Sequence, residues 1–272
     1  MKAWVKALSL LASVSFALSA QPALQLEGEL TQGGLIRGKV EGASSVFFND
    51  TELPLTADGR FVFGVGRDAP LEHLLRVQQN GEEYRHQLTF SARQYDIQHV
   101  NGVAQKYVTP PAEVTQRIQR DSQRVRAVRD TVSALPYIFA TAVMPAQGRI
   151  SGVYGSQRVF NGEPRNPHYG LDVAAPVGAA VIAPLNGTVL LAEELYYSGL
   201  TLIIDHGFGV SSTFMHLNKF TVAVGDDVVQ GDKIAEIGAT GRVTGPHLDW
   251  RINWQQERLD PALLPGLVVN TP

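Results

Sequence analysis

The sequence contains no cysteine among its 272 residues. This excludes disulfide bonds, cysteine metal ligands, a thiol nucleophile and a lipoprotein anchor. The HExxH pattern of helical zinc peptidases and the GxSxG pattern of serine hydrolases are also missing. Positive charge is not in excess, since 23 Lys and Arg against 26 Asp and Glu give a formal net charge of −3. This charge balance argues against a nucleic-acid partner, which usually requires a basic face.

The chain also lacks an apolar run long enough for a transmembrane helix. The run at residues 7–20 has 14 residues, against the ~20 that span a bilayer. It follows Lys2 and Lys6 and ends in ALSA, a pattern typical of a secretory signal cleaved after Ser19 or Ala20. We therefore interpret residues 1–20 as a signal peptide, and expect export to the periplasm or cell envelope without stable membrane insertion. Loss of the two lysines takes the net charge from −3 to −5.

Residues 21–100 show short alternating apolar runs separated by turn signals. Asp58-Gly59 and Asn80-Gly81 lie between such runs, and these dipeptides tolerate the positive φ of tight hairpins. Six or seven strands in about 80 residues predict a small β-sandwich. No constellation of chemically active residues is evident in it.

The apolar period changes over residues 109–135. Valines and isoleucines recur there at helical spacing, and Pro110 and Pro111 can be accommodated in a first helical turn. Five arginines (117, 120, 124, 126 and 129) make this predicted linker helix locally basic. They indicate a solvated helix face, and the alternative is electrostatic attraction to an anionic surface.

Residues 145–265 are rich in glycine and β-branched residues and predict an antiparallel β barrel or sandwich. Short strands are expected at 180–183, 187–192, 201–205, 211–215 and 233–237. The segment VGDDVVQGDKIAEIG has a pattern that biotinyl and lipoyl carrier domains share. Those carriers present a lysine at a hairpin tip, and neither Lys219 nor Lys233 lies in such a tip. The whole chain is thus expected to be mainly β.

Five residues of this last segment have the chemistry of a metal site. His168 and Asp172 lie four residues apart in NPHYGLDVAAP, and His247 and Asp249 lie two apart in GPHLDW. An i, i+2 pair in a strand projects to one face, so both side chains can reach one point. His216, in FMHL, adds a third histidine. Imidazole and carboxylate are zinc ligands, and three protein ligands leave a fourth position open for water.

The order of these motifs resembles the lysostaphin-type (LytM-like) zinc endopeptidases that cut peptidoglycan. HYGLD is followed by IDHGFG, FMHL, VGDDVVQGDKI and GATGRVTGPHLDW, and the resemblance covers about residues 145–262. It implies that His168 and Asp172 bind the metal, and that His216 and His247 act in catalysis without binding it. His206, in IDHGFG, is interpreted as structural.

The function that the resemblance implies is metal-assisted hydrolysis of peptide bonds in peptidoglycan. The metal would activate a water, and His216 and His247 would orient or deprotonate it and stabilise the oxyanion. The alternative is a degenerate, non-catalytic domain that binds the cell wall or activates another wall hydrolase. The cleaved bond and any protein activator are left open.

The third metal ligand of the family is a histidine, and this chain has Asp249 at that position. We expect Asp249 to coordinate as well, which would make a centre of two carboxylates and a divalent cation neutral. Zinc accepts such ligands, and carboxylates also suit manganese. In the alternative, Asp249 forms a salt bridge with Arg251 or Arg242 and no metal binds.

Overall fold

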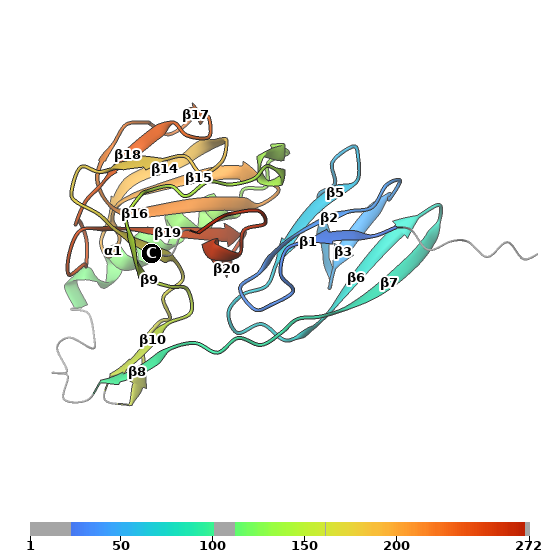
Figure 1. Ribbon diagram of the computed structural model, residues 1–272, viewed down its shortest axis with the longest axis horizontal. Coiled ribbons are helices and arrows are strands. Elements are labelled where there is room, and N and C mark those ends of the chain that lie inside the picture. Colours follow the sequence, from blue (N-terminus) through green and yellow to red (C-terminus); the bar gives the residue numbers. More distant parts are fainter. Residues whose placement is uncertain (1–22, 101–111, 161, 270–272) are drawn as a thin grey trace, which may run out of the picture.

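The computed structural model describes residues 23–100, 112–160 and 162–269. The predicted signal peptide and the first residues of the predicted linker helix lie outside these ranges. Two β-rich units lie side by side, with the N-terminal unit next to the edge of the C-terminal unit that carries β20 (Figure 1). No described helix is long and apolar enough to cross a membrane.

The N-terminal unit consists of two small antiparallel sheets, as expected for a β-sandwich. One sheet has the order β1-β2-β5 and the other β4-β3-β6-β7. Asn80 and Gly81 both have positive φ (53° and 81°), so they form the tight turn that the sequence predicts between β6 and β7. The strand bounds are Gln25–Glu27, Leu35–Lys39, Ser45–Phe48, Thr51–Leu53, Arg60–Gly64, Glu72–Gln79 and Glu82–Thr89 for β1 to β7.

The connection between the units contains helix α1, Ala112–Arg129, and the short 3-10 helix η2, Pro136–Phe139. Helix α1 ends six residues before the predicted end of the linker helix. Its Asp121 accepts a hydrogen bond from the backbone N–H of Tyr196, and the turn after it contacts the side chain of Gln256. The helix is therefore fixed to the C-terminal unit at its middle and at its C-terminal end.

The C-terminal unit is built on a ten-stranded sheet in which every strand pair is antiparallel, and no closed barrel is present among the described strands. Its main order is β17-β14-β15-β16-β19-β12-β9. The strands are β9 (Arg149–Gly152), β12 (Leu171–Ala174), β13 (Ala180–Ile182), β14 (Gly187–Leu195), β15 (Gly199–Gly207), β16 (Val210–Phe220), β17 (Asp227–Val228), β18 (Lys233–Ile237), β19 (His247–Trp254) and β20 (Glu257–Leu259). The 3-10 helix η3, Pro261–Leu263, follows.

A third sheet joins segments that are far apart in the sequence. Strand β8 (Ile97–Val100) pairs in parallel with β10 (Gln157–Phe160), which pairs with β11 (Glu163–Pro164). The sequence analysis missed this sheet, because its strands are short and their partners are not neighbours in the chain. It precedes the segment that carries His168.

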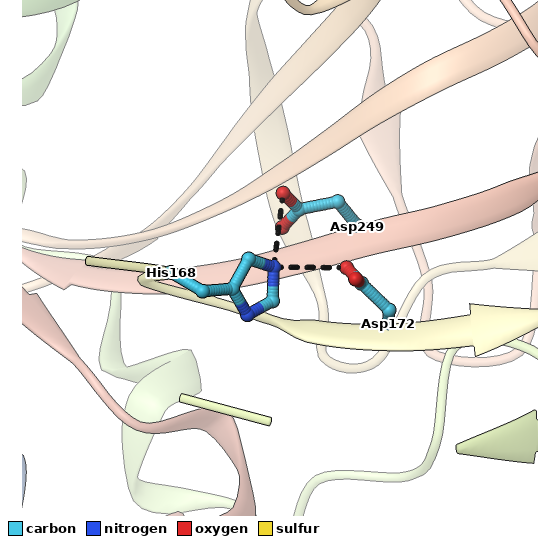
Figure 2. Close-up of side chains that lie close together, drawn as sticks. All are labelled: His168, Asp172 and Asp249. Atoms are coloured by element: carbon cyan, nitrogen blue, oxygen red, sulfur yellow. Dashed lines mark ion pairs between the residues drawn. The ribbon is translucent and has the colours of Figure 1, made fainter. Parts of the chain in front are cut away.

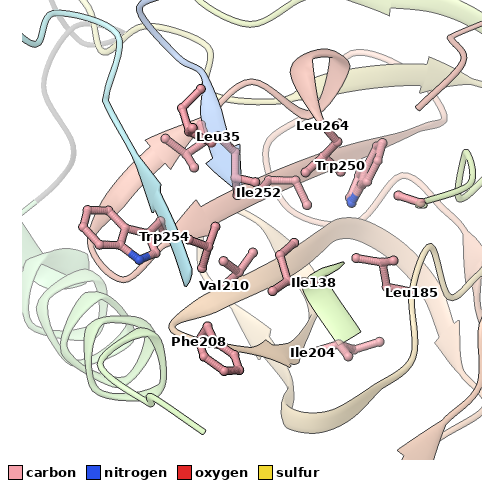
Figure 3. Close-up of a cluster of buried hydrophobic side chains, with 14 of the residues drawn as sticks. Leu35, Ile138, Leu185, Ile204, Phe208, Val210, Trp250, Ile252, Trp254 and Leu264 are labelled. Carbon is pink, nitrogen blue, oxygen red and sulfur yellow. The ribbon is translucent and has the colours of Figure 1, made fainter. Parts of the chain in front are cut away.

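Strand β19 has two chemically different faces. Leu248, Trp250, Ile252 and Trp254 are buried on one face in the core cluster shown in Figure 3. Asp249 and Arg251 alternate with them and therefore point to the opposite face. The apolar face fixes the register of β19, since a slip of one residue would place Asp249 and Arg251 in the apolar cluster instead.

The N-terminal unit packs against the last strands of the C-terminal unit. Phe48 contacts the edge of Trp254, with ring centroids 6.2 Å apart. The side chain of Arg93 crosses the interface and forms an ion pair with Asp260, in which Nη1 lies 2.8 Å from Oδ2. The buried apolar residues of both units form one cluster. The β19–β20 hairpin therefore packs against the N-terminal unit as well as against its own sheet.

His206 lies in β15 and is completely buried. Its Nδ1 lies 2.8 Å from the carbonyl of Asn186, and its Nε2 lies 2.8 Å from the hydroxyl of Ser212. Burial lowers the pKa of His206 to about 4. Both ring nitrogens are used within the core, which fits the structural role expected for this residue.

The depressed pKa of His206 predicts an acid-dependent loss of stability. His206 has a pKa of about 6.5 in the unfolded chain and about 4 in the folded chain. Between these values its imidazole is protonated in the unfolded chain but not in the folded one. The free energy of unfolding therefore falls as the pH decreases from 6.5 towards 4. The contribution is on the order of 2–3 kcal/mol between pH 7.5 and pH 4.5. Denaturant unfolding at these two pH values measures it. His206→Gln should lose stability at both pH values but show a smaller difference between them; an unchanged difference contradicts the assignment.

Candidate metal centre

Two carboxylates face each other across adjacent strands at the centre of the site. Asp172 in β12 is directly opposite Asp249 in β19 in the antiparallel register. Like charges at such positions destabilise a sheet unless a cation or proton lies between them. The sheet therefore needs a positively charged or proton-donating partner at this point.

His168 supplies a nitrogen between the two carboxylates (Figure 2). Its Nε2 lies 3.0 Å from Asp172 Oδ1 and 3.4 Å from Asp249 Oδ2. Its Nδ1 lies 3.1 Å from the carbonyl of Val153 and can only donate to that acceptor, which turns Nε2 towards the carboxylates. Burial alone would lower the pKa of His168, but Asp172 and Asp249 outweigh it and raise the pKa to about 10.

The three side chains fit a divalent cation. Their candidate ligand atoms all lie within 4.8 Å of one another. His168 Nε2 and Asp172 Oδ1 are buried, and they form an ion pair with each other but no hydrogen bond of regular geometry with a described residue. A Cβ on Gly152 would lie 2.3 Å from Asp172 Oδ2, and one on Gly170 would lie 2.1 Å from Asp249 Oδ1. Both glycines thus leave space for the carboxylates, whose oxygens with an imidazole nitrogen suit zinc or manganese.

Asp249 also forms a buried ion pair with Arg251, as one of the two sequence-based alternatives expects. Arg251 Nη2 donates to Oδ2 at 2.7 Å and Nε donates to Oδ1 at 3.0 Å. Burial alone would raise the pKa of Asp249, but Arg251 and then His168 hold it well below its usual range. Asp249 nevertheless still faces His168, because a carboxylate has lone pairs for more than two donors. The two roles are geometrically compatible.

Arg251 changes the charge balance that the sequence predicted for the centre. Two carboxylates and a divalent cation are neutral, but Arg251 adds a positive charge that is paired directly with one carboxylate. Asp249 and Arg251 together are neutral, like the imidazole that the family has at this position. The other predicted partner, Arg242, is instead 4.3 Å from the ring centroid of Tyr197.

His216 and His247 lie beside this cluster, with ring centroids 4.9 Å apart. The Nδ1 of His216 lies 2.9 Å from the carbonyl of Thr240, and the Nδ1 of His247 lies 2.9 Å from the carbonyl of Gly245. Since carbonyls only accept, each Nδ1 carries a proton, and Nε2 is the acceptor atom of the ring when it is neutral. Burial lowers the pKa of His216, so this ring is neutral at pH 7. His247 Nε2 lies 3.9 Å from Asp172 Oδ1.

The backbone of His216 has an unusual conformation. Its φ is 63°, in the left-handed region that few non-glycine residues adopt. The pairing of β16 with β18 is irregular just after it, between Leu217 and Lys219. Such irregularities redirect side chains near functional sites. Here the change directs His216 to the face of His247, and the strain is held by a hydrogen bond from His216 N–H to Ser198 O.

The structure thus brings together all five residues that the sequence analysis selected. Sequence reasoning missed the groups that position them: the carbonyls of Val153, Thr240 and Gly245, and the glycines at 152 and 170. Backbone carbonyls leave no signal in a sequence. Gly170 is part of the HYGLD motif, and its place directly before the strand was the available clue.

Three comparisons relate this chain to known proteins. The family model "Peptidase family M23" matches residues 166–261. Peptidoglycan DD-endopeptidase ShyB of Vibrio cholerae serotype O1 is 42% identical over 86 residues, which are 32% of this chain and 20% of that protein. ShyA of the same organism, also named a peptidoglycan DD-endopeptidase, is 32% identical over 141 residues, 52% of this chain and 32% of that protein. The chain therefore spans a third or less of the length of these curated relatives.

A solved structure of a Pseudomonas aeruginosa protein assigned to peptidase M23 extends the similarity to both units. Its TM-score is 0.68 at 24% identity, and the match covers 88% of this chain and 96% of that chain. At this level of identity the comparison shows a shared fold. The match includes the N-terminal β-rich unit as well as the unit that carries the five residues.

The buried pair of Asp249 and Arg251 predicts a large effect of losing the arginine alone. Arg251→Gln leaves a buried carboxylate without its main partner, which costs about 3–5 kcal/mol of the free energy of unfolding. Asp249→Asn combined with Arg251→Gln removes both charges and should recover most of this loss. Denaturant unfolding of metal-free protein measures both variants. Equal stability of Arg251→Gln and wild type would show that the pair does not form.

Proposed function

We propose that this chain, whose residues 166–261 match the model of peptidase family M23, is an exported metalloendopeptidase that hydrolyses peptide bonds of peptidoglycan. The observation that carries the proposal is the buried cluster of His168, Asp172 and Asp249, whose candidate ligand atoms all lie within 4.8 Å of one another. The relatives named peptidoglycan DD-endopeptidases support peptidoglycan as the substrate. The charged start and apolar run of residues 2–20 support export to the periplasm or cell envelope.

In this proposal His168, Asp172 and Asp249 hold the metal. Zinc fits this ligand set, and manganese is the alternative because two of the ligands are carboxylates. When bound, such a cation lowers the pKa of a water and polarises a carbonyl. Val153 fixes the tautomer of His168 through its carbonyl, and Arg251 fixes the orientation of Asp249.

The two remaining histidines, His216 and His247, provide proton transfer and charge stabilisation in this proposal. Each Nδ1 is committed to a backbone carbonyl, so Nε2 is the atom that each ring presents beside the cluster. In this arrangement neutral His216 accepts a proton from the attacking water, and the imidazolium then donates to the leaving amine. His247 lies close to His216 and Asp172, and it stabilises developing negative charge when its Nε2 carries a proton.

The second candidate function is a non-catalytic domain that binds the cell wall or activates another hydrolase. The ion pair between Arg251 and Asp249 favours it, since this pair occupies a carboxylate that the metal would need. Against it stand the strained His216 backbone and the two glycines that leave space for the carboxylates. A domain without chemistry would gain nothing from this strain.

The role of Asp249 can be tested by changing its donor atom. Asp249→Ala should weaken zinc affinity by more than about 100-fold, because loss of even an outer partner of a metal site costs about 10–100-fold. Asp249→His should retain the metal. Elemental analysis after zinc or manganese loading, followed by release of soluble peptides from purified peptidoglycan, gives the comparison.

If wild type takes up no metal while Asp249→His does, Asp249 does not coordinate. The binding-domain function then replaces the enzymatic one. Arg85→Gln, an exposed change on β7 of the N-terminal unit, serves as the control for non-specific loss of metal.

The role of His216 is separable from metal binding. His216→Ala should keep bound zinc and lower peptide release by about 10²–10⁴-fold, the usual contribution of a general base. His99→Ala, an exposed histidine on β8, is the matched control and should hydrolyse normally. Loss of zinc in folded His216→Ala would assign the residue to the metal instead of to the proton transfer.

A further inference from the structure

A pocket of about 700 Å³ lies between the N-terminal unit and the β19–β20 hairpin. The N-terminal unit contributes Phe48, Arg67 and His73 to its lining, and the C-terminal unit contributes Tyr169, Trp254 and Arg258. The pocket is distinct from the cluster of His168, Asp172 and Asp249, none of which lines it. Both units are needed to form this pocket, because each contributes residues to its lining.

This pocket lies a short distance from the candidate metal centre along β19. Tyr169 directly follows His168 in the sequence. Arg258 in β20 is opposite Asn253 in β19, four residues from Asp249, which is roughly 13 Å along a strand. Its guanidinium lies 4.5 Å from the ring centroid of Tyr169. A peptide that reaches the centre can therefore extend into the pocket within a few residues.

Arg258 is the uncommitted cation of the pocket. Arg67 is committed to the carbonyl of Gly155 and to Asp68, at 3.0 Å and 2.6 Å. Arg258 contacts Tyr169 but has no carboxylate partner among the described residues, and burial lowers its pKa. Two carboxylates also line the pocket. Asp68 is paired with Arg67, and Glu257, which alternates with Arg258 in β20, lies over Gly66 and forms no ion pair with Arg258.

A second arginine near Arg258 also lacks a carboxylate partner among the described residues. Arg129, at the end of α1, is buried, and its Nε has no hydrogen-bond partner among these residues. Burial, Arg258 and Arg251 lower the pKa of Arg129 to about 9. Arg251 is paired with Asp249, whereas Arg129 and Arg258 form no ion pair with a described residue.

The aromatic residues of the pocket do not offer free faces for a sugar. Phe48 and Trp254 are only 5% and 7% exposed, and the guanidinium of Arg258 covers the ring of Tyr169. An anionic group is the ligand that the remaining chemistry fits. Carboxylates pair with arginine in a planar, bidentate arrangement.

We propose that the interdomain pocket binds a carboxylate of the peptide substrate through Arg258, at a distance of a few residues from the bond that is cleaved. This subsite rests on the proposed function, and it gives the N-terminal unit a direct part in substrate selection. Arg258 is a binding residue in this account, since it lies too far from the centre to take part in the chemistry.

The test compares two substrates and three proteins. Purified peptidoglycan is used either untreated or with its carboxylates converted to amides by carbodiimide coupling to ammonia. On untreated material, Arg258→Gln should raise KM by about tenfold with kcat within about twofold of wild type, as expected for loss of one charge-assisted contact in binding. Arg258→Lys keeps the charge but not the bidentate geometry and should recover part of this loss. On amidated material, wild type and Arg258→Gln should have the same KM.

A second measurement is independent of hydrolysis. Co-sedimentation of the full chain with each form of peptidoglycan, in the presence of a chelator, should show stronger binding to the untreated form for wild type but not for Arg258→Gln. If Arg258→Gln loses the same factor on both substrates in KM and in binding, the carboxylate subsite is refuted. If wild type releases no peptide from either substrate, the proposed function fails, and the co-sedimentation result alone decides on the subsite. Glu257→Gln removes a charge from the same pocket and should not weaken binding.

Discussion

The opposition of Asp172 and Asp249 across β12 and β19 is the constraint on which the rest of the site depends. Two carboxylates at directly opposite positions repel each other unless positive charge lies close to both. His168 and Arg251 supply it in the structure, one from each side. The apolar face of β19 fixes the register that creates this opposition. The core therefore determines the chemistry of the site, because any slip of β19 would separate the two carboxylates.

The ion pair of Asp249 and Arg251 is best understood as a neutral unit. An imidazole at position 249 would bring a donor atom without charge, whereas a carboxylate alone would lower the charge of a metal centre by one. The guanidinium restores the balance while leaving Asp249 oriented towards His168. Asp249 and Arg251 together therefore take the place of the neutral histidine that the family has at position 249. The surrounding arginines extend the positive charge towards the interdomain pocket.

Much of this arrangement could be predicted from the sequence, for identifiable reasons. The i, i+2 spacing of His247 and Asp249 defines one strand face, and Asn80-Gly81 defines a hairpin, because both depend on local geometry alone. The third sheet, which pairs β8 with β10, could not be predicted, since strands of four residues give weak patterns and their pairing is not local. The strained backbone of His216 and its carbonyl partner at Thr240 were also beyond prediction. They follow from the tertiary packing of loops.

The most direct measurement is X-ray absorption spectroscopy of the zinc-loaded chain, combined with an anomalous-difference map at the zinc edge. The account predicts zinc bound by one imidazole nitrogen, from His168, and by oxygens of Asp172 and Asp249, with Arg251 still hydrogen-bonded to Asp249. His216 and His247 should stay outside the coordination sphere. Zinc bound by two or more imidazoles, or Asp249 paired with Arg251 away from the metal, would contradict the account.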